Sequence, residues 1–221
     1  RTLFPQYQNA SGWNSLLPAR EDFRSLAGNS AVDIAVIGAG YTGIAAARRW
    51  AAERDQDSIA VLDATRLGEG NPGRNSGFLL EIVLANDADS ASITRMHNCN
   101  HLISGTMNAL RDDVFDAGID CDIERAGTYR AAAGSVGRRS LAAYRRFLDA
   151  ADLPYERLNR AEIEERLGTG YYREGLYSPN CYLVQPAALI RGLAGLLPDS
   201  VDLYEDTPAI GVRRDGDAWL I

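Results

Sequence analysis

The chain has 221 residues, of which 46% are hydrophobic and 24% charged, and this composition excludes a disordered, collagen-like or coiled-coil protein. A net charge of −7 argues against nucleic acid or an anionic membrane as the partner, because both need a basic face. All 23 basic residues are arginine, which excludes a pyridoxal-phosphate Schiff base and a Walker A phosphate loop in this chain, since both require a lysine.

Cysteine usage and hydropathy predict a cytoplasmic protein. Cys99, Cys121 and Cys181 are odd in number and far apart, which is typical of reduced thiols. The longest nearly apolar stretch, residues 34–47, contains three glycines and is too short to cross a bilayer. We therefore expect neither a membrane-spanning segment nor a signal peptide.

The first part of the chain predicts an irregular arm followed by a β-α-β unit. Residues 1–30 mix aromatic residues with Pro, Gly, Asn and Ser, which favours an arm lying over a domain. Residues 31–37 are apolar and β-rich, as in a parallel strand buried on both faces. An alanine-rich helix over 44–54 and a second strand over 58–62 complete the unit.

The rest of the chain continues to alternate helices and strands. The expected elements are a glycine-rich loop over 64–77, an amphipathic helix over 91–117, an extended segment over 119–133, helices over 135–151 and 160–167, a strand-like segment over 175–184, a helix over 186–197, a buried strand over 201–204 and a hairpin over 209–221 that turns at Asp215-Gly216. The last residues, Trp219-Leu220-Ile221, are apolar and strand-like. We expect an incomplete polypeptide, or one of two chains that complete each other, because stable proteins avoid unpaired apolar edge strands.

A glycine motif between the first strand and the first helix predicts dinucleotide binding. Gly38, Gly40 and Gly43 are spaced for a tight turn, a close approach to a pyrophosphate and close packing of the helix on the strand. The helix start presents free N–H groups to the phosphates. Asp63 ends the second strand twenty residues later, where an acidic residue accepts a hydrogen bond from a ribose hydroxyl. The alternative is a merely structural turn.

A second glycine-rich segment favours FAD over a nicotinamide cofactor. Nicotinamide-binding domains usually continue from the second strand directly into another crossover helix. Here residues 68–78, GEGNPGRNSGF, follow instead, and Arg74 and Asn75 lie where they can reach the pyrophosphate and the flavin ring. The alternative is a mobile surface loop without a role in binding.

A family resemblance extends over the loop of residues 68–78 and four further segments: VDIAVIGAGYTGIAAARRW, AGIDCDIERAGTYRAA, NCYLVQPAALIRGLA and VDLYEDTPAIGV. It resembles the D-amino acid oxidase and glycine oxidase superfamily of FAD-dependent oxidoreductases, and within it the γ-glutamylputrescine oxidase-like branch. The resemblance implies an α/β fold: a Rossmann-like FAD-binding domain of the glutathione reductase type 2 class with an interleaved α+β substrate domain, truncated at its C-terminus. The implied segments are an arm over 1–30, a first FAD-binding part over 31–85, a substrate segment over 86–184 and a return to the FAD domain over 185–221.

The resemblance also implies the cofactor contacts. Gly38, Gly40 and Gly43 would line the diphosphate, Asp63 would bind the adenosine ribose, and Arg66 would lie near the adenosine. The full set of implied FAD-binding residues is Gly38, Ala39, Gly40, Tyr41, Thr42, Gly43, Asp63, Ala64, Arg66, Gly73, Arg74, Asn75, Ser76, Gly77 and Ala209. Two departures from the branch are Asn71-Pro72 in place of Ala-Ser, and Ser76 in place of a glycine next to the flavin.

The implied activity is oxidation of the C–N bond of an amine or amino acid. Hydride would pass to flavin N5, the imine would hydrolyse, and O2 or another acceptor would reoxidise the flavin. The catalytic residues stay unassigned. The partners implied are a small-molecule amine or amino acid and the missing C-terminal half or a complementary subunit. A flavin-binding subunit that needs a second polypeptide and a nicotinamide-dependent dehydrogenase are the alternative functions.

Two further groups of residues have mainly structural interpretations. Tyr129, Tyr177 and Tyr182 lie on segments that resemble the substrate-domain sheet, where strand packing is the simpler role and a wall of the amine site the alternative. His97 and His101 would share a helix face as two metal ligands must, but a solvent-facing polar stripe is favoured, and we expect no metal.

Overall fold

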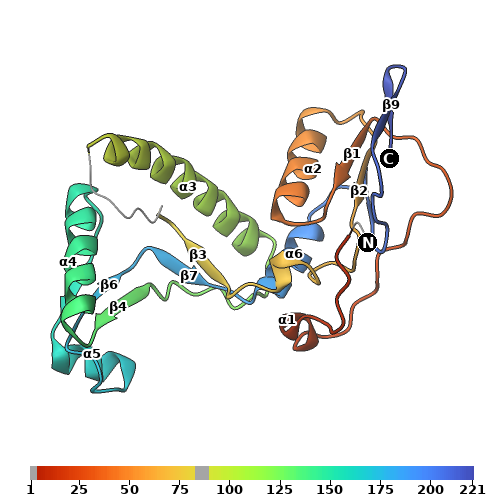
Figure 1. Cartoon of the computed structure of the whole chain (residues 1–221). Coiled ribbons are helices and arrows are strands. Elements are labelled where there is room, and N and C mark those ends of the chain that lie inside the picture. Colours follow the sequence, from red (N-terminus) through yellow and green to blue (C-terminus); the bar gives the residue numbers. More distant parts are fainter. Residues whose placement is uncertain (1–3, 83–89) are drawn as a thin grey trace. The chain divides into compact units, whose positions relative to one another are not determined.

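The structure, a computed structural model, describes residues 4–82 and 90–221 (Figure 1). The chain divides into two compact units. Unit 1 comprises Arg1–Ser76, Asp113–Cys121 and Gln185–Ile221, and unit 2 comprises Gly77–Asp112 and Asp122–Val184. The expected boundary between residues 85 and 86 lies outside the described residues. The compact units change at Ser76–Gly77 and again at Val184–Gln185, and Asp113–Cys121 belongs to unit 1.

Unit 1 contains a parallel sheet with the order β1-β2-β8, formed by β1 (Ile34–Ile37), β2 (Ile59–Leu62) and β8 (Val201–Tyr204). In the register, Ile59 of β2 lies between Ile34 and Val201. The β-α-β unit is therefore confirmed, with α2 (Tyr41–Glu53) connecting β1 to β2 and packing on the sheet. Apolar residues of all three strands drive this arrangement, because a parallel sheet must be covered on its faces.

The first strand differs from the prediction in its burial. All four residues of β2 are buried, but β1 alternates between half-buried and exposed positions, and Ile37 is 55% exposed. Within the described residues β1 has a hydrogen-bonded neighbour on one side only, whereas β2 lies between two strands. The sequence predicted that β1 is buried on both faces, and this prediction is wrong.

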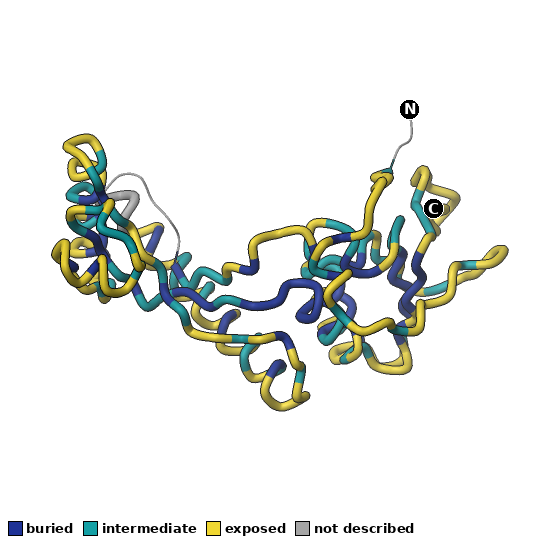
Figure 2. Tube along the Cα trace, turned by 90° about the horizontal axis from the view of Figure 1, so that it is seen from below, coloured by how far each residue is buried: buried dark blue, intermediate teal, exposed yellow. Residues whose placement is uncertain are grey.

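A largely buried helix, α6 (Pro186–Ala194), follows the return of the chain to unit 1. It begins with proline and is capped by Gln185, whose side chain accepts the N–H of Ala188 at 2.8 Å. Residues 186–190 are all buried. Figure 2 shows the buried residues of the described chain in dark blue. α6 contacts α2 and a one-turn helix, α1 (Gly12–Ser15), which the sequence did not predict within the arm.

The end of unit 1 is the expected hairpin. β9 (Arg213–Asp215) and β10 (Ala218–Leu220) pair antiparallel, with Ala218 opposite Asp215. Gly216 in the turn has a φ of 62°, which explains why the sequence places glycine there. The Asp215-Gly216 turn signal is thus confirmed.

The described residues of unit 2 form antiparallel sheets and three helices. Its strands are β3 (Phe78–Leu80), β4 (Thr128–Ala132), β5 (Glu156–Leu158), β6 (Glu174–Ser178) and β7 (Cys181–Leu183), in the orders β4-β6-β5 and β3-β7. The single strand-like segment expected over 175–184 is two strands, interrupted at Pro179-Asn180. Proline causes this break, because it cannot donate to a sheet ladder.

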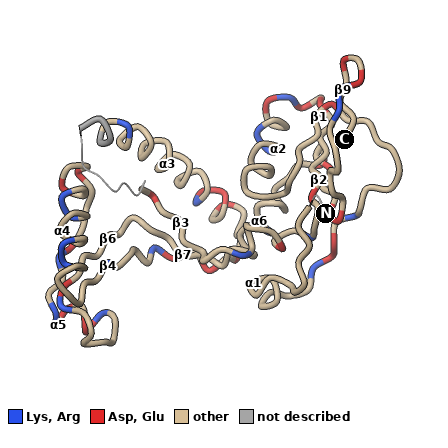
Figure 3. The backbone as a smooth tube through the Cα atoms, in the orientation of Figure 1, with Lys and Arg blue, Asp and Glu red and all other residues tan. Residues whose placement is uncertain are grey.

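The helices of unit 2 are α3 (Ser90–Asp116), which extends into unit 1, α4 (Ser135–Ala150) and α5 (Arg160–Leu167). α4 packs on β4 and β6 and buries Leu141, Tyr144, Phe147 and Leu148, three or four residues apart as one helix face requires. Its other face carries arginines (Figure 3). Across the described part of the chain, no helix combines the length and the hydropathy that a membrane span needs.

Candidate cofactor site

A cavity of about 730 Å³ lies in unit 1 where β1 and β2 end. Its walls are the last residues of the two strands, the start of α2, the loop after β2 and the first residues of the arm. In open α/β sheets, ligands bind at the carboxyl ends of the strands. The cavity therefore occupies the place where this architecture holds a ligand.

The glycine turn forms the floor of this cavity and requires glycine at two positions. Gly38 has a φ of 100°, which other residues rarely adopt, and its N–H donates to the carbonyl of Leu62 at 2.7 Å. A Cβ on Gly43 would lie 1.9 Å from the carbonyl oxygen of Gly38 and 3.3 Å from Val36 Cγ1. Gly43 thus lets α2 start directly against the turn and against β1.

The start of α2 supplies hydrogen-bond donors to the cavity. The helix begins at Tyr41 after Gly40, and no side chain caps its first N–H groups. Tyr41, Thr42 and Gly43 all line the cavity. An uncapped helix start carries a partial positive charge, so this wall attracts an anionic group such as a diphosphate.

Asp63 fixes the glycine turn through hydrogen bonds, and its carboxylate can still accept a further hydrogen bond from a ligand. One carboxylate oxygen accepts the N–H of Ala39 at 2.8 Å, and the other accepts the N–H and the hydroxyl of Thr65 at 2.9 and 3.1 Å. A carboxylate has about four acceptor sites, so it can still accept from a hydroxyl. Asp63 is half-buried and lines the cavity, as a ribose-binding residue must.

The glycine-rich loop lies across the turn. It contains a short 3-10 helix, Asn71–Gly73, and Pro72 Cγ would be 3.4 Å from a Cβ on Gly40. The amide of Asn75 donates to the carbonyls of Asn71 and Pro72 at 3.1 and 2.7 Å. A Cβ on Gly73 would lie 1.8 Å from the carbonyl oxygen of Gly68, so the loop is too tightly folded there for a side chain.

The hydroxyl of Tyr41 lies between this loop and α6. It is 3.4 Å from the carbonyl of Pro72 and 3.3 Å from that of Pro186. Burial raises the pKa of Tyr41 to about 12, with a hydrogen bond to Asn75 acting in the opposite direction. Tyr41 is therefore a neutral hydrogen-bond donor throughout the physiological range.

The structure brings most of the expected residues to the cavity, but not all. Those lining it are Gly38, Gly40, Tyr41, Thr42, Gly43, Asp63, Ala64, Asn75 and Ala209. Ala39, Gly73, Ser76 and Gly77 are not among the lining residues. Arg66 pairs with Asp22, and Arg74 lies over the ring of Tyr7 with 4.3 Å from guanidinium carbon to ring centroid. Both arginines thus face the arm.

Three arm residues and several loop residues line the cavity without having been expected there. The arm contributes Phe4, Pro5 and Tyr7, and the other unexpected residues are Ile37, Leu62, Thr65, Gly70, Asn71 and Pro72. The strand and loop residues flank the glycine motif, so proximity in the sequence could have indicated them. The arm residues carry no such signal, because their approach is a long-range contact.

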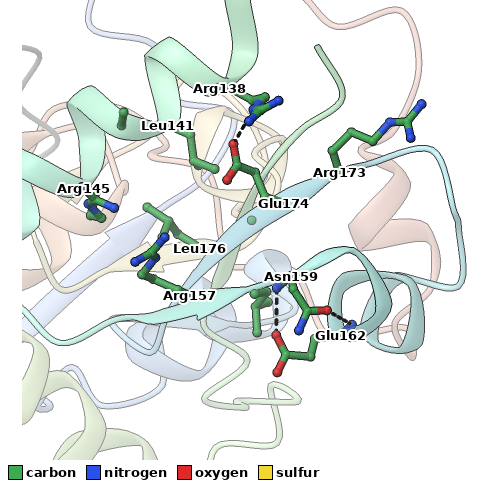
Figure 4. Close-up of a pocket in the computed structure, with 12 residues that line it drawn as sticks. Arg138, Leu141, Arg145, Arg157, Asn159, Glu162, Arg173, Glu174 and Leu176 are labelled. Carbon is green, nitrogen blue, oxygen red and sulfur yellow. Dashed lines mark hydrogen bonds and ion pairs between the residues drawn. The ribbon is translucent and has the colours of Figure 1, made fainter. Parts of the chain in front are cut away.

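A second cavity, of about 440 Å³, lies in unit 2 between α4, β5 and β6 (Figure 4). Its walls include Arg138, which pairs with Glu174 at 2.9 Å, and Leu141 and Leu176. Glu162 is engaged in the cap of α5, where it accepts the N–H of Asn159 at 2.7 Å. The walls mix both charges, and the helix start among them, that of α5, is capped by Asn159, unlike the uncapped start of α2 in unit 1.

The candidate substrate and metal residues of unit 2 are dispersed. Tyr129 and Tyr177 are register partners on β4 and β6, with ring centroids 4.9 Å apart, and Tyr129 is 39% exposed. Tyr182 is buried with its ring facing Arg111 and Arg125. His97 and His101 are exposed on α3, and no cluster of three potential metal ligands occurs in the residues that the structure describes.

Comparison with known proteins decides the family. Residues 33–221 match the family model described as "FAD dependent oxidoreductase" (DAO). The chain belongs to this family. A curated relative, the probable oxidoreductase OrdL of Rhizobium meliloti, is 26% identical over 228 residues, which are 96% of this chain and 50% of that protein.

Solved structures of the DAO family share the fold. Glycine oxidase from Geobacillus kaustophilus superimposes with a TM-score of 0.67 at 20% identity, covering 85% of this chain and 50% of that one. L-amino acid deaminase from Proteus vulgaris gives 0.67 at 16% identity, covering 90% and 46%. This chain thus spans about half the length of these DAO relatives. The α/β fold expected from the sequence is confirmed.

FAD is the cofactor of the DAO family, and the residues of the unit 1 cavity fit it. Gly43 has no room for a side chain, Gly38 has a φ of 100° that side-chain-bearing residues rarely adopt, and the wall beside them carries uncapped N–H groups. The acidic residue stands at the end of the second strand. These are the donor and acceptor positions that a diphosphate and a ribose require.

Proposed function

We propose that this chain is the cofactor-binding portion of an oxidoreductase that oxidises the C–N bond of an amine or amino acid. The observation that carries the proposal is the cavity at the ends of β1 and β2, with its glycine turn, uncapped helix start and Asp63. When bound there, FAD supplies the two-electron acceptor for the oxidation. The protein supplies the binding and the orientation.

The residues of unit 1 divide this task among them. The turn at Gly38 and Gly40 and the first N–H groups of α2 hold the diphosphate, because they combine a close backbone approach with a positive helix end. Asp63 accepts a hydrogen bond from the adenosine ribose. Ala209 lies against the adenine, and Asn75 lies towards the flavin.

The substrate class is argued from relatives and from unit 2. The structural relatives carry the names glycine oxidase and L-amino acid deaminase, and both names denote action on amino acids. The antiparallel sheet of unit 2 then carries the substrate-binding surface, and the partly exposed ring of Tyr129 beside Tyr177 is its candidate amine-binding wall. An aromatic face attracts an amine cation, which suits such a wall.

The test uses the full-length protein. Its visible spectrum should show oxidised flavin, and under anaerobic conditions an amine or amino acid from a panel should bleach that spectrum. Asp63→Ala should weaken FAD binding by about 10-fold or more, since it removes a charged acceptor. The matched control is Asp202→Asn, an exposed position outside the cavity, which should bind FAD normally.

Two results would contradict the proposal. Failure of the wild-type protein to bind FAD would remove the cofactor, and bleaching only by substrates without a C–N bond, such as hydroxy acids, would remove the substrate class. Equal FAD affinity in Asp63→Ala and Asp202→Asn would show that the ribose contact is misplaced.

A further inference from the structure

The N-terminal arm lies outside the matched family region, which begins at residue 33. Its described residues are nevertheless held on unit 1 at several points. At one end Phe4, Pro5 and Tyr7 line the cofactor cavity. Further along, Leu26 packs against the buried core formed by β2 and β8. The arm is therefore part of the folded unit and reaches its ligand cavity.

The middle of the arm holds the carbonyl groups of the glycine-rich loop. The amide of Asn14 donates to the carbonyl of Leu67 at 3.2 Å, and the indole N–H of Trp13 donates to that of Asn75 at 2.8 Å. The hydroxyl of Ser11 donates to the carbonyl of Gly73. Three peptide planes of the loop that crosses the glycine turn are thus oriented by the arm.

The arm also engages the charged side chains of that loop. Glu69 accepts the N–H of Ser11 at 2.6 Å and the amide of Asn14 at 2.8 Å. Arg74 donates to the carbonyl of Asn9 at 2.5 Å, and its guanidinium lies over the ring of Tyr7. Glu69 and Arg74 form an ion pair with each other at 3.3 Å, and the arm satisfies their further hydrogen-bonding groups. Arg74 is thereby held away from the cavity.

The arm segment that makes these contacts is itself fixed by unit 1. Gln185, the cap of α6, donates through its amide to the carbonyl of Trp13 at 2.9 Å. Arg191 of α6 donates to the carbonyl of Pro18 at 3.1 Å. A loop supported in this way keeps its geometry before a ligand arrives, which lowers the ordering cost of binding.

We infer that the arm over residues 4–18 is a working part of the FAD site, with Trp13 and Tyr7 as positioning residues for the glycine-rich loop. The inference rests on the proposed function, because it assigns the cavity to FAD. It adds that arm and cofactor are coupled: docking of the arm strengthens FAD binding, and FAD in turn strengthens docking of the arm. Such coupling is reciprocal by thermodynamic necessity.

The first test measures FAD affinity in the full-length apoprotein by flavin fluorescence. Trp13→Phe keeps an aromatic ring but removes the N–H that holds Asn75, and should weaken binding by about 5-fold, the order expected for one hydrogen bond. The matched control is Trp50→Phe, which removes an indole N–H that donates to Asp57 at 2.9 Å. Trp50 does not line the cavity. It should bind FAD as the wild type does.

A second variant keeps the test decisive if Trp13→Phe disturbs folding. Tyr7 is 39% exposed and outside the core, so Tyr7→Leu leaves the fold intact while removing the ring under Arg74. Its FAD affinity should fall by about 3-fold. Unfolding curves of the three apoproteins identify any variant whose fold has changed.

The reciprocal effect is measured by limited chymotrypsin digestion, which does not depend on activity. Saturating FAD should slow cleavage after Leu16 in the arm relative to cleavage after Trp219 in the hairpin, since both side chains are exposed. If wild type binds FAD but both arm variants bind as tightly as Trp50→Phe, or if FAD leaves the Leu16 rate unchanged, the coupling is wrong and the proposed function stands. If wild type does not bind FAD, both fail.

Discussion

Arg20 and Glu205 form an ion pair that joins the arm to the end of β8, 185 residues away in the sequence. Arg20 Nη1 lies 3.1 Å from Glu205 Oε2, and a second bond joins Nη2 to Oε1. The Glu205 side chain is 1% exposed and also accepts the N–H of Phe23 at 2.9 Å and that of Leu67. One buried carboxylate therefore ties the arm, the loop and the sheet together.

Removing this charge should destabilise unit 1. We expect Glu205→Gln to lower the free energy of unfolding by about 3 kcal/mol, because it removes the buried carboxylate and leaves the largely buried Arg20 with only the exposed Asp22, at 3.6 Å, as a counter-charge. Asp202→Asn is the control, since its pair with Arg24 is exposed and should contribute little to stability. Urea denaturation measures the free energy of unfolding of both variants. Equally small losses of stability in the two would show that the buried ion pair stabilises the fold no more than the exposed one does.

Gly43 should be intolerant of any side chain. Gly43→Ala places a Cβ against the carbonyl of Gly38, so we expect both the stability of unit 1 and FAD binding to fall. Gly105→Ala in α3 is the matched control, because nothing lies within 4 Å of its added Cβ. That variant should gain up to about 1 kcal/mol, as alanine favours a helix interior. Normal FAD binding by Gly43→Ala would refute the close packing at the turn.

The pair between Arg48 and Asp113 predicts a pH-dependent stability. Two hydrogen bonds of 2.6 and 2.9 Å join α2 to the end of α3, and the Arg48 guanidinium holds the pKa of the Asp113 carboxyl below its usual value. A depressed carboxyl pKa stabilises the fold above the unfolded pKa of about 4, and this contribution is lost as the pH falls through the folded value.

The corresponding variant is Asp113→Asn. At pH 7 it should cost about 1 kcal/mol or less, because both side chains are about one-third exposed. The difference from wild type should close as the pH is lowered below about 4. Denaturation at a series of pH values measures it, and a gap that stays constant down to pH 2 would contradict the assignment.

Substitution by alanine should change the stability of the protein in opposite directions at two asparagines of unit 2. Asn159 caps α5, its side chain accepting the N–H groups of Ala161 and Glu162 at 2.9 and 3.1 Å, so Asn159→Ala should cost about 1 kcal/mol. Asn108 lies exposed inside α3, so Asn108→Ala should be neutral or stabilising. Thermal denaturation compares them, and a stabilising Asn159→Ala would show that the cap is not formed.

Local patterns were enough to locate most elements of the chain. The helix over Arg160–Leu167 and the strand over Val201–Tyr204 have the expected limits, and the hairpin turns where its glycine predicts. Such signals depend on neighbouring residues only. The one-turn helix at Gly12–Ser15 and the strand at Glu156–Leu158 were missed because both are short and are stabilised by distant partners.

The sequence by itself determined the cofactor end of the protein: glycine spacing, a helix start and Asp63 at the end of a strand specify a dinucleotide site through backbone geometry that is local to one β-α-β unit. Only the tertiary structure decided how that site is enclosed. Arg66 and Arg74, expected at the cofactor, turn to the arm instead, and Glu205 becomes a buried anchor. These outcomes depend on which charges and carbonyls are brought together across long separations, and no local pattern encodes that pairing.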